Sequence, residues 1–182
     1  MKFIQKAKKS LGQNFLIDKN IINKIIEIGN INNNKIVLEI GPGHGNLTEA
    51  ILNKKPKKIY AIEKDKHLTS DLKKKYENYK NFQIINQDIL DIIKEKKFHQ
   101  KMIIFGNLPY NISTKILASL ILLKDWPPWY EVLIFMFQKE VADRIMANEQ
   151  TKDFSRLTVL SNWRLEIKKH FNVSKHCFFP KP

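Results

Sequence analysis

The sequence contains a single cysteine and very little arginine. Cys177 has no second cysteine with which to form an internal disulfide, which is typical of a protein kept in a reducing compartment. No apolar run approaches the roughly 18 residues that would cross a bilayer, and the first residues lack the apolar core of a signal peptide. We therefore expect a soluble, cytoplasmic protein with no membrane partner.

Several kinds of catalytic site are also absent from the sequence. There is no G-x-S-x-G elbow and no Gly-Lys-Ser/Thr of a P-loop. The histidines do not show the spacing of metal ligands, so we expect no metal site. These histidines are His44, His67, His99, His170 and His176.

What the chain has in excess is positive charge. Its 182 residues are 43% hydrophobic, enough for one domain with a buried core, and carry a formal net charge of +14. Such a charge favours nucleic acid as the partner before an acidic membrane, although a lysine-rich coding bias would produce the same charge. We expect one domain over residues 1–182, in which residues 1–18 form a basic segment that covers the cofactor. Its lysines are Lys2, Lys6, Lys8 and Lys9.

Short apolar runs alternate with helical patterns along the chain. Strands are expected at 36–40, 59–62, 82–86, 102–106 and 132–137. Helices are expected at 18–28, 47–52, 113–123, 138–146 and 156–163, with a charged helix between Glu63 and Tyr76 and an extended segment at 165–173. Asp18 and Ser113 are the expected N-caps of two of these helices. This alternation predicts an α/β fold with a mostly parallel sheet, helices on both faces and right-handed crossovers.

Four successive predicted strands end at residues suited to binding. Gly41, Glu63, Asp88 and Asn107 stand at or just beyond these ends. Because open α/β sheets bind ligands outside the carboxyl ends of their strands, we expect these residues to form one site.

The tetrapeptide Asn107-Leu108-Pro109-Tyr110 follows the fourth predicted strand. An amide, a proline-stiffened turn and an aromatic ring at this place suit a planar amine, held by hydrogen bonds at its edge and a ring on its face. The exocyclic amine of adenine is such a group. A proline turn with a half-buried tyrosine is the alternative interpretation.

The loop after the first predicted strand indicates the cofactor. Gly41, Gly43 and Gly45 are spaced G-x-G-x-G, which is not the dinucleotide fingerprint. Glu63, roughly 20 residues further on, can accept both hydrogens of a ribose diol. Asp88 can accept a hydrogen from an adenine amine, with Ile89 packed on the ring. Together these residues favour S-adenosylmethionine over NAD.

The residues at this point resemble a known family, the small-subunit (16S) ribosomal RNA adenine N6,N6-dimethyltransferases (the KsgA/RsmA group). The matching stretches, in chain order, are Leu11–Leu16 (LGQNFL), Glu39–Gly43 (EIGPG), Gly106–Ser113 (GNLPYNIS), Phe137–Val141 (FQKEV) and Phe178–Pro182 (FFPKP). The resemblance implies a class I S-adenosylmethionine-dependent methyltransferase fold, Rossmann-like. It also implies a monomer that acts in ribosome biogenesis on the immature small subunit, at two adjacent adenosines in the 3′-terminal hairpin loop of its rRNA.

The resemblance also implies roles for individual residues. It places Asn107 at the target amine, and Tyr110 and Phe178 against the target ring, with Phe179 in a variable position. Leu108 and Pro109 complete the catalytic motif, and Asn107 also borders the cofactor. The remaining cofactor-binding residues are Gln13, Asn14 and Leu16 at the methionine end, Gly41 and Gly43 beneath it, Glu63 at the ribose, Asp88 and Ile89 at the adenine, and Lys64, to which no part of the cofactor is assigned.

The sequence departs from the family pattern in two places. Phe154–Thr158 (FSRLT) stands where the family usually has Tyr-Gly-Arg-Leu-Ser. Family members also continue beyond the position of Pro182 into a last sheet strand and a small C-terminal helical domain. We expect both to be absent here. The sheet is then expected to have an unpaired edge, and loss of the C-terminal region could leave this chain inactive on its own.

Three other functions remain open at this stage. A large-subunit rRNA methyltransferase of the macrolide-resistance type shares the Gln13-Asn14 pair and a similar catalytic motif. A non-catalytic RNA-binding or transcription accessory factor could keep the same fold and pocket. A DNA adenine methyltransferase usually has an acidic residue at the position of Asn107, which argues against that activity.

Overall fold

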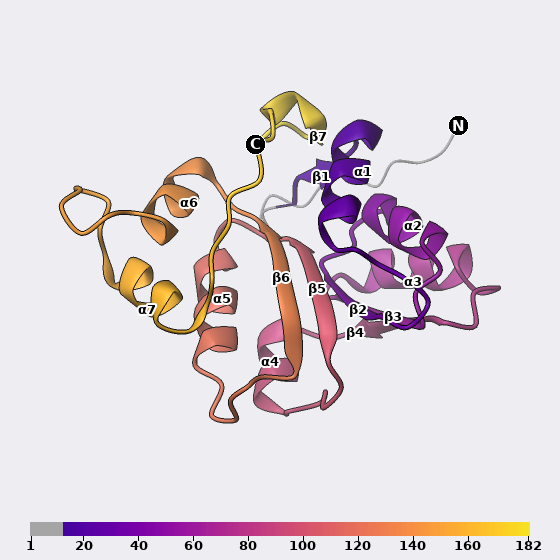
Figure 1. Cartoon of the computed structure of the whole chain (residues 1–182). Helices are drawn as coiled ribbons and strands as arrows, with labels where there is room; N and C mark the ends of the chain where they lie inside the picture. Colours follow the sequence, from indigo (N-terminus) through magenta and orange to yellow (C-terminus); the bar gives the residue numbers. More distant parts are fainter. Residues whose placement is uncertain (1–12) are drawn as a thin grey trace.

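The computed structural model describes residues 13–182, and its centre is a five-stranded, wholly parallel sheet (Figure 1). The spatial order of the strands is β4-β3-β2-β5-β6. The chain therefore builds outward from β2 in one direction and then crosses to β5 and builds in the other. Ligands of such sheets bind where the order reverses, beyond the carboxyl ends of β2 and β5. The strands are β2 (Ile36–Ile40), β3 (Lys58–Glu63), β4 (Phe82–Asn86), β5 (Met102–Asn107) and β6 (Tyr130–Met136).

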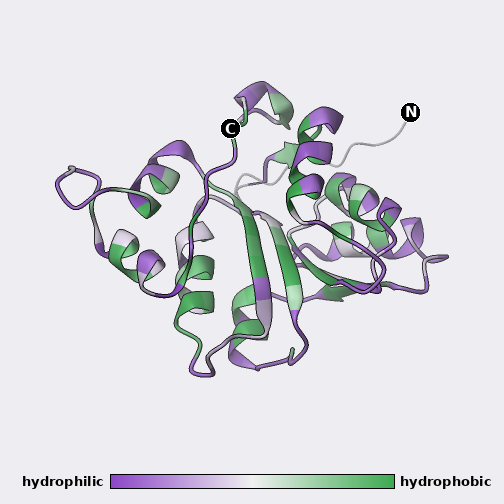
Figure 2. Cartoon of the chain, in the orientation of Figure 1, coloured by the Kyte–Doolittle hydropathy of each residue, from purple (hydrophilic) through white to green (hydrophobic). Residues whose placement is uncertain are grey.

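Alternating side chains of the central strands fill two cores, one on each face of the sheet. Val37 of β2 and Phe105 of β5 point to one face, whereas Leu38 and Ile104 point to the other. All four are fully buried, as expected for parallel strands covered on both sides. Figure 2 shows β5 and β6 as predominantly apolar strands.

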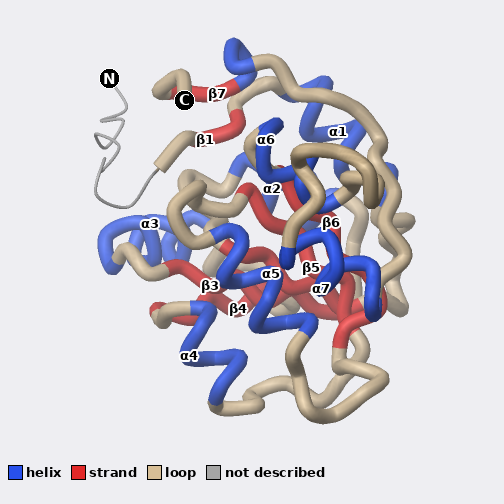
Figure 3. Tube along the Cα trace, turned by 90° about the vertical axis from the view of Figure 1, so that its left-hand side faces the viewer, coloured by secondary structure: helices blue, strands red, loops and turns tan. Residues whose placement is uncertain are grey.

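Helices cover both faces of the sheet, as the sequence predicts. One face packs against α1 (Lys19–Ile28), α2 (Asn46–Asn53) and α3 (Lys66–Lys75). The other packs against α4 (Ile89–Lys94) and α5 (Ser113–Ile121). Two further helices, α6 (Lys139–Ile145) and α7 (Arg156–Arg164), pack on the outer side of α5 (Figure 3).

A two-stranded antiparallel ribbon lies outside the main sheet. It pairs β1 (Phe15–Leu16) with β7 (Phe178–Phe179), which follows a short 3-10 helix, Lys175–Cys177. Figure 1 shows this ribbon beside α1, above the ends of the central strands. The ribbon joins the two ends of the described chain near the expected site, and the sequence patterns did not predict it.

The structure corrects three local expectations. Helix α4 was not predicted, and Asp88 is its N-cap, with the carboxylate accepting from the Leu90 N–H at 2.9 Å. Ser113 is the first residue of α5 and not its N-cap, because Ile112 holds that position. Strand β6 begins at Tyr130, two residues before the predicted start.

No helix within residues 13–182 combines the length and the apolarity that a membrane crossing requires.

The predicted helix capped by Asp18 is confirmed, since the Asp18 side chain accepts hydrogen bonds from the N–H groups of Asn20 and Ile21.

Candidate active site

A cavity opens at the carboxyl ends of β2 to β5, where the sequence predicts the site. Eleven of the predicted residues line this cavity. The predicted residues outside its wall are Leu108, Tyr110 and Phe178. The lining residues that were predicted are Gln13, Asn14, Leu16, Gly41, Gly43, Glu63, Lys64, Asp88, Ile89, Asn107 and Pro109.

The glycine loop after β2 forms the floor of the cavity. Gly41 has a φ of 68°, and a side chain added there would meet only the carbonyl oxygen of Asn107, at 4.0 Å. The space above Gly41 is therefore open to a ligand. Gly43 has a different constraint, because the ring of Phe15 lies against it and leaves no room for a Cβ. The loop thus presents backbone to the cavity on one side and carries the N-terminal segment on the other.

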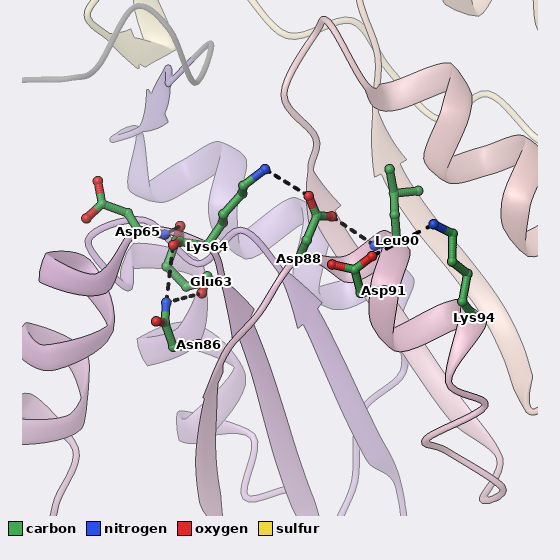
Figure 4. A network of polar contacts seen from close by, with 8 residues as sticks. All are labelled: Glu63, Lys64, Asp65, Asn86, Asp88, Leu90, Asp91 and Lys94. Atoms are coloured by element: carbon green, nitrogen blue, oxygen red, sulfur yellow. Dashed lines mark hydrogen bonds and ion pairs between the residues drawn. The ribbon is translucent and has the colours of Figure 1, made fainter.

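Glu63 ends β3 and ties the glycine loop to the neighbouring strand. Its carboxylate accepts from the N–H of Asp65 at 2.9 Å and from the N–H of Gly43 at 3.3 Å. Burial raises the pKa of Glu63, and the two backbone N–H groups oppose that rise. Asn86 of β4 donates to the Glu63 backbone carbonyl at 2.9 Å and fixes the strand end (Figure 4). A carboxylate with two bonds made retains lone pairs for a ligand.

Asp88 lies at the other end of the cavity and forms an ion pair with Lys64 at 3.0 Å (Figure 4). Burial would raise the pKa of Asp88, but the Leu90 N–H and the Lys64 ammonium more than offset it, so the pKa is lowered. Asp88 is therefore an anion that can accept further hydrogen bonds. The Lys64 side chain is 64% exposed, so it can shift when a ligand enters.

Asn107, the last residue of β5, makes one side-chain hydrogen bond. Its Nδ2 donates to the backbone carbonyl of Asn14 at 2.7 Å. A carbonyl oxygen can only accept, so this contact fixes which end of the amide is nitrogen. Within residues 13–182, Oδ1 of Asn107 and the backbone carbonyl of Leu108 accept no hydrogen bond. Among the described residues, Oδ1 of Asn107 is therefore an available acceptor at the lip of the cavity, whereas the Leu108 carbonyl belongs to a residue that is 1% exposed and does not line it.

The three predicted residues outside the cavity wall have separate surroundings. The Leu108 side chain is 1% exposed and packs in the core, where the absence of a side chain at Gly106 makes room for it. Tyr110 is half-buried in the turn before α5, and burial together with Glu140 raises its pKa. Phe178 is 7% exposed and pairs with Leu16, whereas Phe179 is 54% exposed. The stacking role of Phe178 stays a prediction.

The sequence patterns missed several residues that build the site. Glu39 of β2 is buried in the cavity wall, and this burial raises its pKa to about 7. The hydrogen bond from the Thr48 hydroxyl lowers the pKa of Glu39, and the nearby Glu63 carboxylate raises it further. Thr48 donates to the Glu39 carboxylate at 2.6 Å. A lone carboxylate inside the apolar run 36–40 was the signal for it. Asn46, whose amide donates to the Leu16 carbonyl at 2.7 Å, had no such signal.

Residues 14–16 are held at the cavity by contacts on three sides. Phe15 packs against the ring of His44, with centroids 4.2 Å apart, while Asn46 and Asn107 bind the carbonyls of Leu16 and Asn14. The amide of Asn14 can donate to the Pro180 carbonyl at 3.2 Å. The predicted basic residues Lys2, Lys6, Lys8 and Lys9 lie outside the described residues.

The donor set fits an adenosyl group. Open space above the Gly41 backbone, the buried carboxylate of Glu63 and the anionic Asp88 follow one another around one cavity. Among residues 13–182, no three His, Cys, Asp or Glu side chains gather as metal ligands would.

Comparisons with known proteins agree on one family. The family model described as "Ribosomal RNA adenine dimethylase" matches residues 4–182. Ribosomal RNA small subunit methyltransferase A of Pelagibacter ubique (strain HTCC1062) is 51% identical over 177 residues, which cover 97% of this chain and 66% of the relative. The protein of the same name from Wolbachia pipientis wMel is 41% identical and covers 100% of this chain and 63% of the relative. The chain spans less than two thirds of the length of these curated relatives.

Solved structures show the same likeness. A dimethyladenosine transferase from Plasmodium falciparum superposes with a TM-score of 0.79 at 34% identity, covering 92% of this chain and 59% of that one. The 23S rRNA methyltransferase ErmE superposes with a TM-score of 0.74 at 26% identity, covering 92% of this chain and 65% of that one.

Proposed function

The chain belongs to the ribosomal RNA adenine dimethylase family, and we propose that it dimethylates the N6 amines of two adjacent adenosines in the 3′-terminal hairpin loop of small-subunit (16S) rRNA, with S-adenosylmethionine as methyl donor. Its α/β fold is that of class I methyltransferases. The observation that carries the proposal is the hydrogen bond from Asn107 Nδ2 to the Asn14 carbonyl, because it leaves Oδ1 free at the cavity lip.

Asn107 acts by orienting the target amine. An amide cannot remove a proton at neutral pH, so it serves as an acceptor and not as a general base. Its Oδ1 takes one N6 hydrogen and the Leu108 carbonyl takes the other. The nitrogen lone pair, otherwise delocalised into the purine ring, is then directed out of the ring plane toward the cavity.

Positioning supplies most of the catalysis in this proposal. S-adenosylmethionine, when bound, supplies a methyl group made electrophilic by its sulfonium sulfur. Asn107 and Leu108 hold the amine in line with that methyl, and well-oriented groups of this kind lower a barrier by about 7–11 kcal/mol. The N6 proton leaves to water after the bond forms. Because N6 keeps one hydrogen after the first transfer, one of the two acceptors can still bind it, and a second methylation in the same pocket is chemically possible.

The cofactor is held by residues of three strand ends. Glu63 accepts hydrogen bonds from the hydroxyls of the ribose, and Asp88 accepts one from the adenine amine, with Ile89 against the adenine ring. Gly41 and Gly43 let the backbone approach, while Gln13, Asn14 and Leu16 cover the methionine end. Lys64 turns from Asp88 when the adenine enters, and its aliphatic stem then covers the adenine edge.

The target base must leave its stack to reach these acceptors. Tyr110, separated from the acceptors by Pro109, stacks on the extruded adenine, an interaction worth about 1–3 kcal/mol per base. The family role of Phe178 would require its ring to leave the core position beside Leu16. The net charge of +14 supports RNA of the immature small subunit as the partner of a cytoplasmic monomer.

The proposal is tested by transfer of tritiated methyl groups to unmethylated small and large ribosomal subunits, assayed separately. We expect incorporation into the small subunit, with dimethyladenosine mapped to the two adjacent adenosines of the 3′-terminal hairpin. The likeness to ErmE makes large-subunit methylation the second candidate, and incorporation there alone would establish it. No incorporation into either subunit, with RNA still bound, would leave a non-catalytic factor.

A further inference from the structure

Helix α7 exposes apolar side chains and buries polar ones. Thr158 and Ser161 on its inner face are 2% and 0% exposed, whereas Val159 and Trp163, one turn apart on its outer face, are 56% and 60% exposed. The Thr158 hydroxyl donates to the Arg144 carbonyl. This bond, with a second from the amide of Asn162 to the backbone of α6, holds α7 in its orientation. Trp163 is therefore presented to solvent by bonds that fix the helix.

Arg164 brings a second tryptophan to the same place. Its guanidinium carbon lies 3.9 Å from the ring centroid of Trp163 and 4.6 Å from that of Trp126. Its Nη1 also donates to the carbonyls of Ile121 and Leu123, both at 2.9 Å, at the end of α5. A guanidinium anchored in this way holds both indole rings in place.

We name Trp126, Trp163 and Arg164 the tryptophan platform. Trp126 is 42% exposed, so both rings keep free surface. Leu122 extends the apolar surface beside it, with 58% of its own surface exposed. Large exposed aromatic groups that are already rigid lose little entropy when they bind a partner.

Two exposed cations flank the platform, Lys124 beside the end of α5 and Arg156 at the start of α7. Within residues 13–182 no ion pair engages either of them, Asp125 is paired with Lys96, and the nearby Glu166 is exposed as well. The chain has only three arginines among 32 basic residues, and two of them, Arg156 and Arg164, lie on α7. Planar aromatic rings beside unpaired cations match the bases and phosphates of a single-stranded nucleic acid.

The platform is within reach of the proposed active site. Helix α5 begins three residues after Tyr110 and its far end carries the carbonyls that bind Arg164. Its nine residues correspond to a length of about 13 Å. Figures 1 and 3 both show α7 beside α5. An RNA strand whose base enters the cavity can therefore reach the platform over α6 and α7, which cover the outer side of α5.

We propose that the tryptophan platform is a second RNA-binding site, at which unpaired bases flanking the methylated hairpin stack on Trp163 and Trp126 while Lys124 and Arg156 contact phosphates. The site goes beyond the proposed function but rests on it for the identity of the RNA. It contacts neither the methyl donor nor the target amine, so it contributes to affinity for RNA and not to the chemical step.

Tryptophan fluorescence and fluorescence anisotropy test the site on the 182-residue chain. The probe is a transcript of the 3′-terminal hairpin of small-subunit rRNA with its single-stranded flanks. The chain has three tryptophans, Trp126, Trp129 and Trp163. We expect the transcript to quench their emission through stacking. The double variant Trp126→Phe with Trp163→Phe, which retains only Trp129, should lose most of the quenching.

Substitutions at one position separate stacking from apolar contact. Trp163→Leu keeps apolar surface without a ring and is expected to weaken RNA binding about tenfold, whereas Trp163→Phe stays within about twofold of the unmodified chain. Tyr79→Leu, a ring 45% exposed after α3, is the matched control and should not change binding. Thermal unfolding checks that the variants remain folded.

Three outcomes would overturn the site. Unquenched emission with equal RNA affinity for all variants would exclude stacking, while methyl transfer by the same chain would leave the proposed function intact. Unchanged RNA affinity together with self-association that Trp163→Leu abolishes would make the platform a protein contact. A chain that neither binds the transcript nor transfers methyl groups would refute the proposed function and the platform together.

Discussion

The side-chain amide of Asn107 donates a hydrogen bond to the backbone carbonyl of Asn14 at 2.7 Å, across 93 positions of sequence. The contact joins the end of β5 to the segment that covers the cavity. It therefore couples the group proposed to orient the target amine to the residues proposed to hold the methionine end of the cofactor.

Glu63→Ala is expected to weaken binding of S-adenosylhomocysteine by roughly 10- to 100-fold, because two ribose hydrogen bonds to a charged acceptor are lost. Isothermal titration calorimetry measures the dissociation constant. Glu131→Ala, which removes an exposed carboxylate paired with Lys35, is the matched control. Equal affinities for the two variants would contradict the ribose contact.

Asp88→Asn and Lys64→Met test the ion pair at the adenine end. The Lys64 ammonium is largely exposed, so its loss should change affinity for S-adenosylhomocysteine by less than about threefold. Asp88→Asn removes the charged acceptor and is expected to weaken binding about tenfold. If Lys64→Met proves the more damaging of the two, Lys64 itself binds the ligand.

The stability of the protein is expected to depend on pH through Glu39. Its folded-state pKa, about 7, lies above the ordinary value of 4.5, so the folded state holds the proton more tightly than the unfolded state does. This contribution is fully present below about pH 4.5 and is lost as the pH rises to about 7. The loss is at most about 3 kcal/mol.

Urea unfolding of the unmodified chain and of Glu39→Gln, at several pH values, measures this effect. The side-chain amide of the variant can still accept a hydrogen bond from the Thr48 hydroxyl, and it does not ionise. The stability of the unmodified chain should therefore fall relative to that of the variant between pH 4.5 and 7. A difference that does not vary with pH would mean that Glu39 titrates normally.

The two phenylalanines of β7 are expected to behave differently. Phe178→Leu should lower the free energy of unfolding by about 1 kcal/mol, because its ring is buried beside Leu16. Phe179→Leu, at an exposed ring, should leave stability unchanged. Thermal unfolding with a methyl-transfer assay distinguishes them. Normal stability of Phe178→Leu with loss of transfer would assign Phe178 to base stacking.

Much of the fold follows from local patterns in the sequence. The strands 36–40 and 82–86 were predicted with their observed bounds, and the other three central strands to within two residues, because buried parallel strands are short apolar runs bounded by turns. Helix α4 was missed because six residues are too few to show a helical period. The β1–β7 ribbon joins residues more than 160 positions apart and has only two residues in each strand, so no local pattern could indicate it.

The site was predictable where chemistry coincides with a strand end. Gly41, Glu63, Asp88 and Asn107 all satisfy that condition, and the structure gathers them around one cavity. Contacts that arise from tertiary folding were not predictable. The Asn46 bond to the Leu16 carbonyl and the stack of Trp126, Arg164 and Trp163 join segments whose proximity only the fold determines.

The rate of a single methyl transfer by Asn107→Ala, measured together with its affinity for S-adenosylhomocysteine, tests the account most directly. We expect the single-turnover rate on small subunits to fall at least about 100-fold while the dissociation constant changes less than about fivefold, because the amide orients the amine and contributes little to cofactor binding. Asn107→Asp, which cannot donate to the Asn14 carbonyl, should also be slow. An unchanged rate for Asn107→Ala, or a loss explained entirely by weaker cofactor binding, would contradict the account.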